Sequence, residues 1–527
     1  MALIYPTGLE FFHAFFGITL AGAVPVPLYP PVRLGRLDEY HQRTAEMLRA
    51  SGAVLVLTNK TLRRLLGPTL EKARPELGCR LLEELPSGLP TTVATGPEDL
   101  ALVQFSSGTT VQPKPVALSH RAVLAQVDLL NANWPEPEEE GALKPSGVSW
   151  LPLYHDMGLI GCVFPALERP GTLTLLGPEV FVTRPATWLR TISRYRATIS
   201  VAPNFAYGLC VEKIRDEELE GVDLSTWRVA LNGAEPVAPR VLRSFQERFA
   251  KWGFRPEALT PVYGLSEATL AVTFSDLQRP FRTVHLDREH LAEGRAQLDP
   301  NGQELVSVGC PLPGVDVEIR DSSGHEVREG RVGRVWTKSP SLMTGYLGRP
   351  EATAEALREG WLDTGDVGFL REGELFLTGR AKDLLILRGR NHSPVEIEQA
   401  MDGVPGVRKG CAVAVSYLPD GGDGEVLLLF VEHRAEVEDS ELEAMPAACA
   451  EAALSASGLR LDEVHVVAPG TLPRTSSGKL RRQATLLRHQ EGALEPPRKV
   501  TPLFLAGALA RSALAHVRSR RKDEPPT

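Results

Sequence analysis

The stretch SSGTT at Ser106–Thr110, with Lys114 shortly after it, decides how the rest of the sequence is interpreted. The apolar run Leu102–Phe105 comes directly before it and predicts a buried strand. Ser119 then precedes apolar residues at helical spacing and is a candidate N-cap. A strand, a hydroxyl-rich loop and a helix in this order offer backbone N–H groups, side-chain donors and one lysine charge to an anion. The stretch therefore predicts a phosphate-binding loop.

An ordinary polar turn is the alternative for the same residues. The loop is not a Walker P-loop, because no Gly-Lys-Ser/Thr sequence ends it. Serine, threonine and glycine are also the residues that turns favour for their own backbone geometry. Motifs further along the chain must decide between the two interpretations.

The composition is that of a globular protein with two or three domains. The chain has 527 residues, of which 43% are hydrophobic and 24% charged, and its formal net charge is -8. This acidic balance argues against a nucleic-acid partner. The six cysteines form no Cys-x-x-Cys pair, which favours free thiols over disulfides or zinc. Glu10, His13 and Pro25 interrupt the apolar run at 9–30, so we expect no transmembrane segment or signal peptide and a cytoplasmic location.

Polar loops follow three predicted strands in the first half of the chain. Residues 8–60 already alternate between helix and strand patterns, with strands at 23–28 and 53–57, which predicts an α/β fold. The three later strands, at 198–201, 228–231 and 259–263, end in polar or glycine-containing loops. Open α/β sheets bind ligands at the carboxyl ends of their strands, so these loops are expected to share one pocket.

The second half of the chain changes in character several times. The polar segment 274–306 loses periodicity and is interpreted as an inserted surface segment. Short glycine-rich strands over 308–348 predict a β-rich subdomain, and the stretch 373–379 is expected to be hairpin-like. A smaller alternating unit then follows, with strands near 410–416, 425–432 and 464–468 and a helix near 437–457. Residues 504–522 predict a basic amphipathic helix, for which docking on the protein is favoured over membrane anchoring.

Four motifs together resemble the adenylate-forming superfamily of acyl-CoA synthetases, peptide-synthetase adenylation domains and luciferases. They are Ser106–Lys114, Tyr263–Glu267, Thr364–Asp366 with Arg380, and Lys479. Each motif is weak alone, but the four occur in the family's order between Met1 and about Arg482. Three stretches resemble sequences of the fatty acyl-AMP ligase subgroup in particular. They are Trp150–Gly161 (WLPLYHDMGLIG), Tyr263–Val272 (YGLSEATLAV) and Gly379–His392 (GRAKDLLILRGRNH).

The resemblance implies an α/β protein of two unequal domains. The large N-terminal adenylate-forming domain, over 1–380, would combine layered α/β sheets with a β-rich subdomain. Residues 381–383 would form a hinge to a smaller, mobile C-terminal α+β domain over 384–500, followed by the basic tail over 501–527. The segment 274–306 lies where the subgroup carries an insertion that is implicated in disfavouring coenzyme A. Because Met1–Tyr5 already reads as a core strand, we also expect that an opening segment found in relatives is absent.

The resemblance also implies the reaction: a fatty acid and ATP give an acyl-adenylate and pyrophosphate. The acyl group would then pass to the phosphopantetheine thiol of an acyl carrier protein. The substrate carboxylate is its own nucleophile, so the protein must neutralise charge and hold two anions together. By resemblance, Lys479 would bridge the carboxylate and the α-phosphate, and Glu267 would hold Mg²⁺.

Further roles follow from the resemblance residue by residue. Asp366 and Arg380 would bind the ribose, and Asn232, Gly233 and Ala234 would line the adenine slot. His155 and Phe205 would form walls of the acyl pocket. His155 is also a candidate catalytic residue, together with Lys479 and Glu267. Lys382 would be the hinge. The ATP- or AMP-binding set comprises Ser106, Ser107, Gly108, Thr109, Thr110, Lys114, Asn232, Gly233, Ala234, Tyr263, Gly264, Asp366 and Arg380. The alternatives are a structural His155–Asp156 pair, a capping Asp366, a surface ion pair for Glu267 and a solvated Lys479.

Two departures from the family pattern keep other functions open. Val111 and Pro115 stand where the family usually has glycine, and neither residue shares the backbone freedom of glycine. A degenerate paralogue that binds nucleotide without turnover is therefore one alternative. An acyl-CoA synthetase, which differs in its acceptor, is another. A peptide-synthetase adenylation domain is less favoured, because no aspartate stands in an obvious position to hold an α-amino group.

Overall fold

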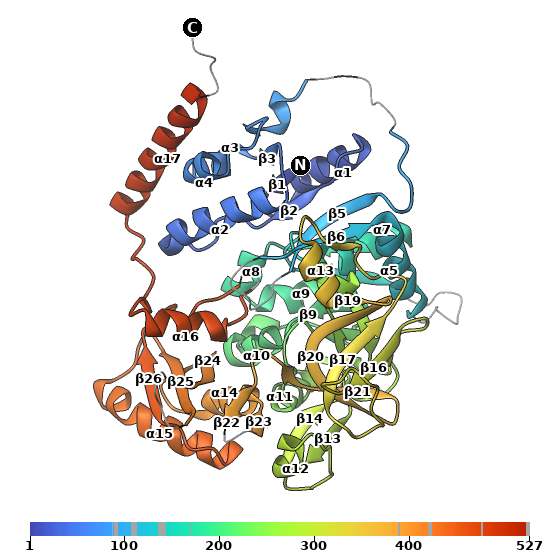
Figure 1. Cartoon of the computed structure of the whole chain (residues 1–527), viewed down its shortest axis with the longest axis vertical. Helices are drawn as coiled ribbons and strands as arrows, with labels where there is room; N and C mark the ends of the chain where they lie inside the picture. Colours follow the sequence, from blue (N-terminus) through green and yellow to red (C-terminus); the bar gives the residue numbers. More distant parts are fainter. Residues whose placement is uncertain are drawn as a thin grey trace.

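The chain forms a large N-terminal body of several sheets, coloured blue to yellow in Figure 1, and a smaller C-terminal part in orange and red. This computed structural model describes residues 1–522 apart from 87, 89–92, 107–112, 135–143, 170, 388–389, 420–423 and 476–477, and leaves out the side chains of 517 and 519–522. The predicted loop residues Ser107, Gly108, Thr109 and Thr110, and the departure Val111, lie outside the described residues.

A four-stranded sheet with the order β2-β1-β3-β4 opens the chain. Its strands run parallel and are β1 (Ala2–Ile4), β2 (Val26–Leu28), β3 (Val56–Thr58) and β4 (Cys79–Arg80). The helices between them are α1 (Leu9–Leu20), α2 (Leu37–Ala50), α3 (Lys60–Arg63) and α4 (Gly67–Ala73). In α1, Phe11, Phe15 and Ile18 are buried at helical spacing, which explains why this segment is a helix. The predicted alternation is confirmed, with the strand expected at 53–57 beginning at Val56 instead.

A seven-stranded sheet with the order β15-β12-β11-β10-β9-β7-β8 forms the centre of the body. Strands β7 (Ser146–Ser149), β8 (Thr172–Leu175), β9 (Ile199–Ala202), β10 (Val229–Asn232) and β11 (Leu259–Gly264) are parallel, whereas β12 (Ala271–Phe274) and β15 (Cys310–Pro311) are antiparallel additions. The neighbouring helices include α6 (Asp156–Gly158), α7 (Phe164–Glu168), α8 (Pro178–Thr183), α9 (Ala186–Arg194), α10 (Asn204–Lys213) and α11 (Pro239–Phe249). Because β9, β10 and β11 are adjacent and parallel, their carboxyl ends share one edge, as the sequence predicted.

The element that follows the hydroxyl-rich loop is a strand and not the helix that we expected. Between the loop and α5 (His120–Ala132) runs a further strand, β6 (Pro115–Ser119), which pairs antiparallel with β5 (Leu100–Phe105). The loop therefore joins two strands, and the prediction that it leads directly into a helix N-terminus is wrong. Ser119 does cap α5, accepting a hydrogen bond from the Ala122 N–H at 3.2 Å. Pro115 is tolerated because it is the first residue of its strand.

The β-rich region contains the predicted hairpin. Its strands are β16 (Asp316–Arg320), β17 (Gly333–Lys338), β19 (Leu357–Arg358), β20 (Trp361–Arg371) and β21 (Glu374–Arg380), while β18 (Gly345–Tyr346) joins β6 and helix α13 (Pro350–Ala356) lies nearby. Within 274–306, β13 (Thr283–Leu286), α12 (Arg288–Ala292) and β14 (Gln303–Val306) form a small ordered unit. Val284 and Leu286 are buried in one cluster with Phe369 and Phe376. The segment thus has regular structure that its irregular sequence did not suggest.

The C-terminal part has a three-stranded sheet of its own. The sheet is formed by β24 (Val407–Tyr417), β25 (Val426–His433) and β26 (Glu463–Val467), and β22 (Leu385–Leu387) pairs with β23 (Arg390–His392) separately. The helices of this part are α14 (Pro394–Ala400), α15 (Asp439–Ser457) and α16 (Arg482–Gln490). Residues including Ile397, Leu429 and Cys449 form a separate buried cluster. Arg36 at the start of α2 bridges the two parts, donating hydrogen bonds of 2.9 and 3.1 Å to the carbonyls of Gly470 and Thr471.

The last helix, α17 (Pro502–Lys522), packs on α4 in the N-terminal body. The Gly67 N–H donates to Ser512 Oγ at 2.9 Å, and a ring nitrogen of His516 lies 2.8 Å from the Arg63 carbonyl. This contact confirms the expectation that the tail helix docks on the protein. Within the described residues, no helix is long and apolar enough to cross a bilayer.

Candidate active site

Asp366 is the centre of a buried group formed by two strands. It lies in β20 directly opposite Arg380 of β21, and the Arg380 Nε is 3.0 Å from Asp366 Oδ1. Tyr263, at the end of β11, donates its hydroxyl to Asp366 Oδ2 at 2.7 Å. Burial, and then the charge of Asp366, raise the pKa of Tyr263 far above its usual 10.0, so the phenol keeps its proton. A carboxylate held in this way still has lone pairs to accept two ribose hydroxyls.

The loop after β10 has an unusual backbone and an unsatisfied acceptor. A Cβ on Gly233 would lie 2.8 Å from Val262 Cγ2, so only glycine fits there. Ala234 has a φ of 69°, a left-handed conformation that is strained for alanine. The Oδ1 of Asn232 is buried and has no hydrogen-bond partner in the described part of the chain. An orphaned acceptor fits a donor such as the amino group of adenine.

Glu267 lies on a tight turn after β11. A Cβ on Gly264 would collide with the carbonyl oxygen of Leu270, so the turn requires glycine at this position. Tyr346 from β18 donates its hydroxyl to Glu267 Oε1 at 3.0 Å. Lys114 Nζ lies 4.5 Å from the centroid of the Tyr346 ring, and burial lowers the pKa of this lysine while Glu267 opposes the shift. Lys114 and Glu267 are therefore brought together, as the sequence predicted.

His155 and Asp156 form a close pair at the start of α6. The His155 Nδ1 is 2.5 Å from Asp156 Oδ1, and Ser266 donates its hydroxyl to Asp156 Oδ2. Burial alone would raise the pKa of Asp156, but His155 and these hydrogen bonds outweigh burial and hold the pKa well below its usual range. The polar atoms of His155 and Asp156 thus already have partners within the protein, as expected if the pair serves only a structural role. Any catalytic role of His155 stays a prediction.

Lys479 reaches this group from the C-terminal part. Two hydrogen bonds hold its backbone to Thr475. The Lys479 N–H donates to the Thr475 hydroxyl at 3.0 Å, and the Thr475 N–H donates to the Lys479 carbonyl at 2.8 Å. Burial lowers the pKa of Lys479, with Arg380 adding to the shift, while Asp156, Glu235 and Asp366 oppose it. The lysine charge therefore lies among residues contributed by the N-terminal body. Ser476 and Ser477 of the same motif lie outside the described residues.

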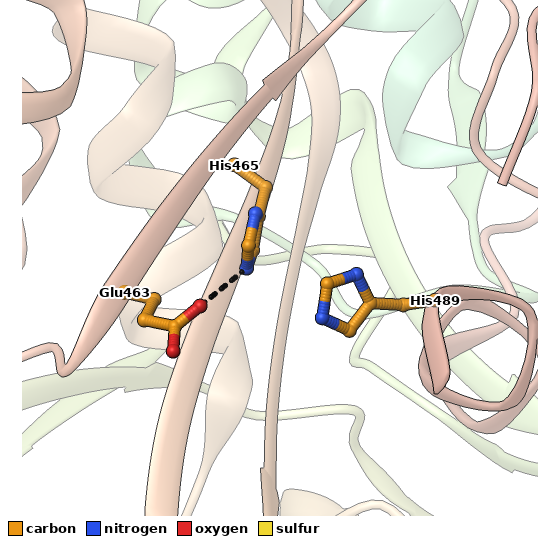
Figure 2. A group of neighbouring side chains, drawn as sticks. All are labelled: Glu463, His465 and His489. Atoms are coloured by element: carbon orange, nitrogen blue, oxygen red, sulfur yellow. Dashed lines mark ion pairs between the residues drawn. The ribbon is translucent and has the colours of Figure 1, made fainter. Parts of the chain in front are cut away.

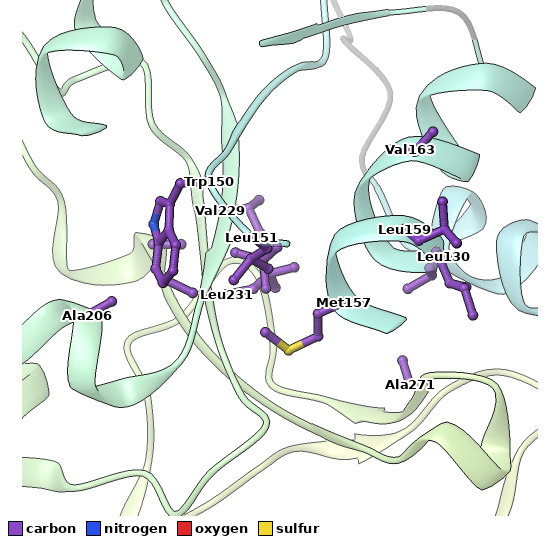
Figure 3. Packing of buried hydrophobic residues seen from close by; sticks show 14 of the residues in the cluster. Leu130, Trp150, Leu151, Met157, Leu159, Val163, Ala206, Val229, Leu231 and Ala271 are labelled. Carbon is purple, nitrogen blue, oxygen red and sulfur yellow. The ribbon is translucent and has the colours of Figure 1, made fainter. Parts of the chain in front are cut away.

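Phe205 stands at the first turn of α10 with 41% of its surface exposed. Its ring meets Trp150 edge-on at a centroid distance of 6.0 Å, and Trp150 stacks on Phe181 at 3.9 Å. Figure 3 shows Trp150, Leu151, Leu231 and Met157 among the buried apolar side chains of the N-terminal body. An exposed aromatic ring backed by buried apolar side chains is consistent with one wall of an acyl pocket.

The predicted hinge residue Lys382 is exposed, between the half-buried Ala381 and the buried Asp383. Its carbonyl accepts a hydrogen bond of 3.2 Å from Gln483 Nε2, at the start of α16. Ser106, the last described residue before position 107, is half-buried, and its N–H donates to the Lys114 carbonyl at 3.1 Å.

Sequence reasoning missed three residues of this site. Tyr346 fixes Glu267, and Ser266 fixes Asp156. Glu235 accepts a hydrogen bond of 2.6 Å from the Phe205 N–H, and burial raises its pKa. Ser266 stands inside the quoted motif Tyr263–Val272, and Glu235 directly follows the predicted Asn232, Gly233 and Ala234, so their positions were a usable signal. Tyr346 has no such local signal, because it is 79 residues from its partner.

The residues present fit ATP and Mg²⁺. Lys114 and Lys479 could supply positive charge for the phosphates, and Glu267 could supply one carboxylate to a hard cation that prefers oxygen ligands. The Asp366 carboxylate and the Asn232 amide would take the ribose and the base. One site thus offers partners to each part of a nucleotide, with a separate C-terminal part delivering one lysine to it.

A nucleotide site on a large N-terminal body, completed by a lysine from a smaller C-terminal part, is typical of adenylate-forming enzymes, and comparisons with known proteins agree. A family model described as AMP-binding enzyme matches residues 1–347. A Caulobacter vibrioides protein provisionally named an acyl-CoA synthetase is 36% identical over 92% of this chain and 84% of its own length. The medium-chain-fatty-acid–[acyl-carrier-protein] ligase JamA of Moorena producens is 33% identical over 94% of this chain and 86% of its own.

A solved structure points in the same direction. It comes from a study of fatty acyl-adenylate ligases of E. coli and L. pneumophila and superposes with a TM-score of 0.87 at 34% identity, covering 93% of this chain and 88% of that one. The chain belongs to the AMP-binding enzyme family, within its fatty acyl-AMP ligase subgroup.

Proposed function

We propose that this protein activates a fatty acid with ATP, giving an acyl-adenylate and pyrophosphate. The observation that carries the proposal is the position of Lys479, whose charge interacts with Asp366, Arg380 and Asp156 although it belongs to the C-terminal part. A cation at this point can hold the fatty-acid carboxylate and the α-phosphate together.

The proposed reaction needs no protein nucleophile. A carboxylate oxygen of the acid bonds to the α-phosphorus, and the bond from that phosphorus to the pyrophosphate oxygen breaks. Tyr263, Asp366 and Arg380 would hold the ribose, while Asn232, Gly233 and Ala234 would border the base. Lys114 would bind phosphate oxygens. Glu267 would hold Mg²⁺, which neutralises phosphate charge when bound.

A lysine substitution tests the central claim. We expect Lys479→Ala to lower kcat for pyrophosphate release with a fatty acid about 100- to 1000-fold, the range for removing one preorganised charge partner. Lys409→Ala is the matched control, because Lys409 is an exposed lysine of the same C-terminal part. Equal rates for Lys479→Ala and the wild type would overturn the proposed role.

The acceptor is proposed to be the phosphopantetheine thiol of an acyl carrier protein. JamA supports this by name, whereas the C. vibrioides relative is named for coenzyme A. The two can be separated in one reaction that contains the protein, Mg-ATP, mixed fatty acids, coenzyme A and a phosphopantetheinylated carrier protein. We expect mass spectrometry to show acyl-AMP and acyl-carrier without acyl-CoA. Abundant acyl-CoA would make the protein an acyl-CoA synthetase.

The hinge is also part of the proposal. Residues 381–383 would let the C-terminal part, proposed as a lid over 384–500, move after adenylation so that Lys479 withdraws and the thiol can enter. Support comes from Lys382, which is exposed beside the buried Asp383. A degenerate paralogue is less well supported, because Lys479, Glu267 and Asp366 keep the partners that the reaction needs.

A further inference from the structure

Two histidines and a glutamate meet on the C-terminal part, in a cluster formed by Glu463, His465 and His489. Glu463 and His465 lie two residues apart on β26, which is the edge strand of its sheet, so their side chains leave the strand on the same face. His489 comes from the last turn of α16 and faces them (Figure 2). The cluster uses none of the residues assigned above to nucleotide or acyl binding.

The ligand-type atoms of these side chains are close enough to share one ion. One atom from each residue can be chosen so that all three lie within 4.8 Å of one another. The His465 Nε2 is 3.0 Å from Glu463 Oε2, and the two imidazole rings are 4.5 Å apart between centroids. Small side-chain rotations would place all three atoms at the distances of about 2.0–2.2 Å at which histidine and carboxylate bind Zn²⁺.

A second observation concerns the nitrogen at the centre of the cluster. The His465 Nε2 is buried, and it has no hydrogen-bond partner of acceptable geometry in the described part of the chain, although Glu463 is near. The His465 ring cannot easily turn away, because it stacks on Phe430 at 4.8 Å with an interplanar angle of 17°. A buried nitrogen that faces a carboxylate without a well-formed hydrogen bond would be satisfied by a cation placed between the two.

We propose that Glu463, His465 and His489 bind one divalent transition-metal ion, with Zn²⁺ the best fit. Two imidazoles and one carboxylate are a ligand set that Zn²⁺ accepts, with a fourth position open to water.

A bound ion would tie α16 to the edge of the sheet. α16 begins at Arg482, shortly after Lys479, so the metal would fix the helix that follows the lysine loop. In the described part of the chain, α16 already packs on the sheet through Leu486, which shares an apolar cluster with Val467 of β26. His489 also meets Phe430 of β25 edge-on and lies beside His465, so a bound ion would add to these contacts. The ion is therefore inferred to stabilise the C-terminal part rather than to take part in adenylation.

Cobalt binding tests the site directly. Full-length protein without a histidine tag is treated with a chelator, dialysed into excess Mg²⁺ to occupy oxygen-ligand sites, and titrated with Co²⁺ while the visible d–d absorption is recorded. We expect one equivalent of Co²⁺ to bind with an intense, four-coordinate spectrum that Zn²⁺ abolishes. His489→Gln and His465→Gln should each weaken Co²⁺ binding by about tenfold or more, since each removes a ligand.

His433→Gln is the matched control, because His433 ends the neighbouring strand β25 outside the cluster. This variant should bind Co²⁺ as the wild type does. Zn²⁺ should also raise the melting temperature of the wild type and of His433→Gln but not of His489→Gln. Circular dichroism and pyrophosphate release would establish that each variant is folded. No saturable binding by the wild type, or equal affinity in the His489→Gln and His433→Gln variants, would overturn the proposal and leave an aromatic packing cluster.

Discussion

Tyr263 and Asp366, 103 residues apart in the sequence, are joined by a hydrogen bond of 2.7 Å. The bond links the carboxyl end of the central sheet to the β20–β21 hairpin, two parts of the N-terminal body that meet at the proposed nucleotide site. Because burial and the aspartate charge keep the phenol protonated, Tyr263 acts as a fixed donor and orients the carboxylate.

Removal of this donor should weaken nucleotide use. Tyr263→Phe keeps the ring but deletes a hydrogen bond to a charged acceptor, a loss of about 1.5–3 kcal/mol, or roughly ten- to a hundredfold in kcat/KM for ATP. The measurement is pyrophosphate release over a range of ATP concentrations at saturating fatty acid. Tyr195→Phe, at an exposed tyrosine, should leave kcat/KM unchanged. If Tyr263→Phe and the wild type have the same kcat/KM for ATP, the hydrogen bond from Tyr263 is not needed to orient Asp366.

The pH dependence of adenylation should report on Lys479. Burial lowers the pKa of this lysine from the ordinary 10.5, so the ammonium is lost at a lower pH than for a solvated lysine. The rate of acyl-adenylate formation should therefore fall on the alkaline side, as pH rises through the lowered pKa. Lys479→Arg retains its charge at these pH values, so its profile should lack that fall.

A second variant keeps this prediction testable if arginine does not fit the site. The residual rate of Lys479→Ala should also lack the alkaline fall, since no group titrates at that position. If the wild type and both variants decline over the same pH range, the titrating group is not Lys479.

A buried ion-pair network beside the proposed hinge should govern the stability of the C-terminal part. Arg482 binds Glu398 through two bonds of 2.7 and 2.6 Å, and binds Asp383 at 2.9 Å. Arg482→Ala would remove the ion-pair partner of the buried Asp383 and leave Glu398 with the hydrogen bond from the Ala414 N–H, at a cost of about 3–5 kcal/mol. Calorimetry should show the transition of the C-terminal part at a lower temperature. Arg482→Lys should recover only part of the loss, because lysine cannot form the two-pronged contact.

The control for this network is Arg460→Ala, at an exposed arginine of the same part. Its melting profile should match that of the wild type. A similar shift in Arg460→Ala and Arg482→Ala would mean that lost charge in general, rather than the buried network, lowers the melting temperature.

Much of the site was predictable because its residues follow strands in short motifs. Asn232 ends β10 and Glu267 follows β11, and parallel neighbours bring such positions to one edge. Asp366 and Arg380 were predicted as a pair from the family resemblance, and the β20–β21 hairpin places them opposite each other. In these cases local pattern and topology determine the contact.

The rest depends on contacts that local patterns do not encode. The strand β6 was missed because it is short and begins with Pro115, a residue that usually argues against a strand. The role of Tyr346 depends on β18 pairing with β6, a contact between segments far apart in the chain. The order within 274–306 arises from Val284 and Leu286 packing on Phe369 and Phe376, which lie outside that segment.

The docking of α17 on α4 should depend on the absence of a side chain at Gly67. A Cβ there would overlap the backbone oxygen of Ser512, and the Gly67 N–H also donates to the Ser512 hydroxyl. Gly67→Ala should therefore release the helix and allow trypsin to cleave after the already exposed Arg511 and Arg518 at least about tenfold faster, because local opening controls proteolysis. Mass spectrometry of the fragments over time is the measurement.

Two further variants separate a local release from general destabilisation. Ser512→Ala removes the hydrogen bond without the overlap, so its cleavage should accelerate less than that of Gly67→Ala. Gly17→Ala is the matched control, because a Cβ at this helical glycine meets no atom within 4 Å and alanine favours the helix. Its tail should be cleaved at the wild-type rate. If Gly67→Ala and Gly17→Ala are cleaved equally fast, the contact between Gly67 and Ser512 does not hold α17 in place, and the docking must come from the other contacts along α4.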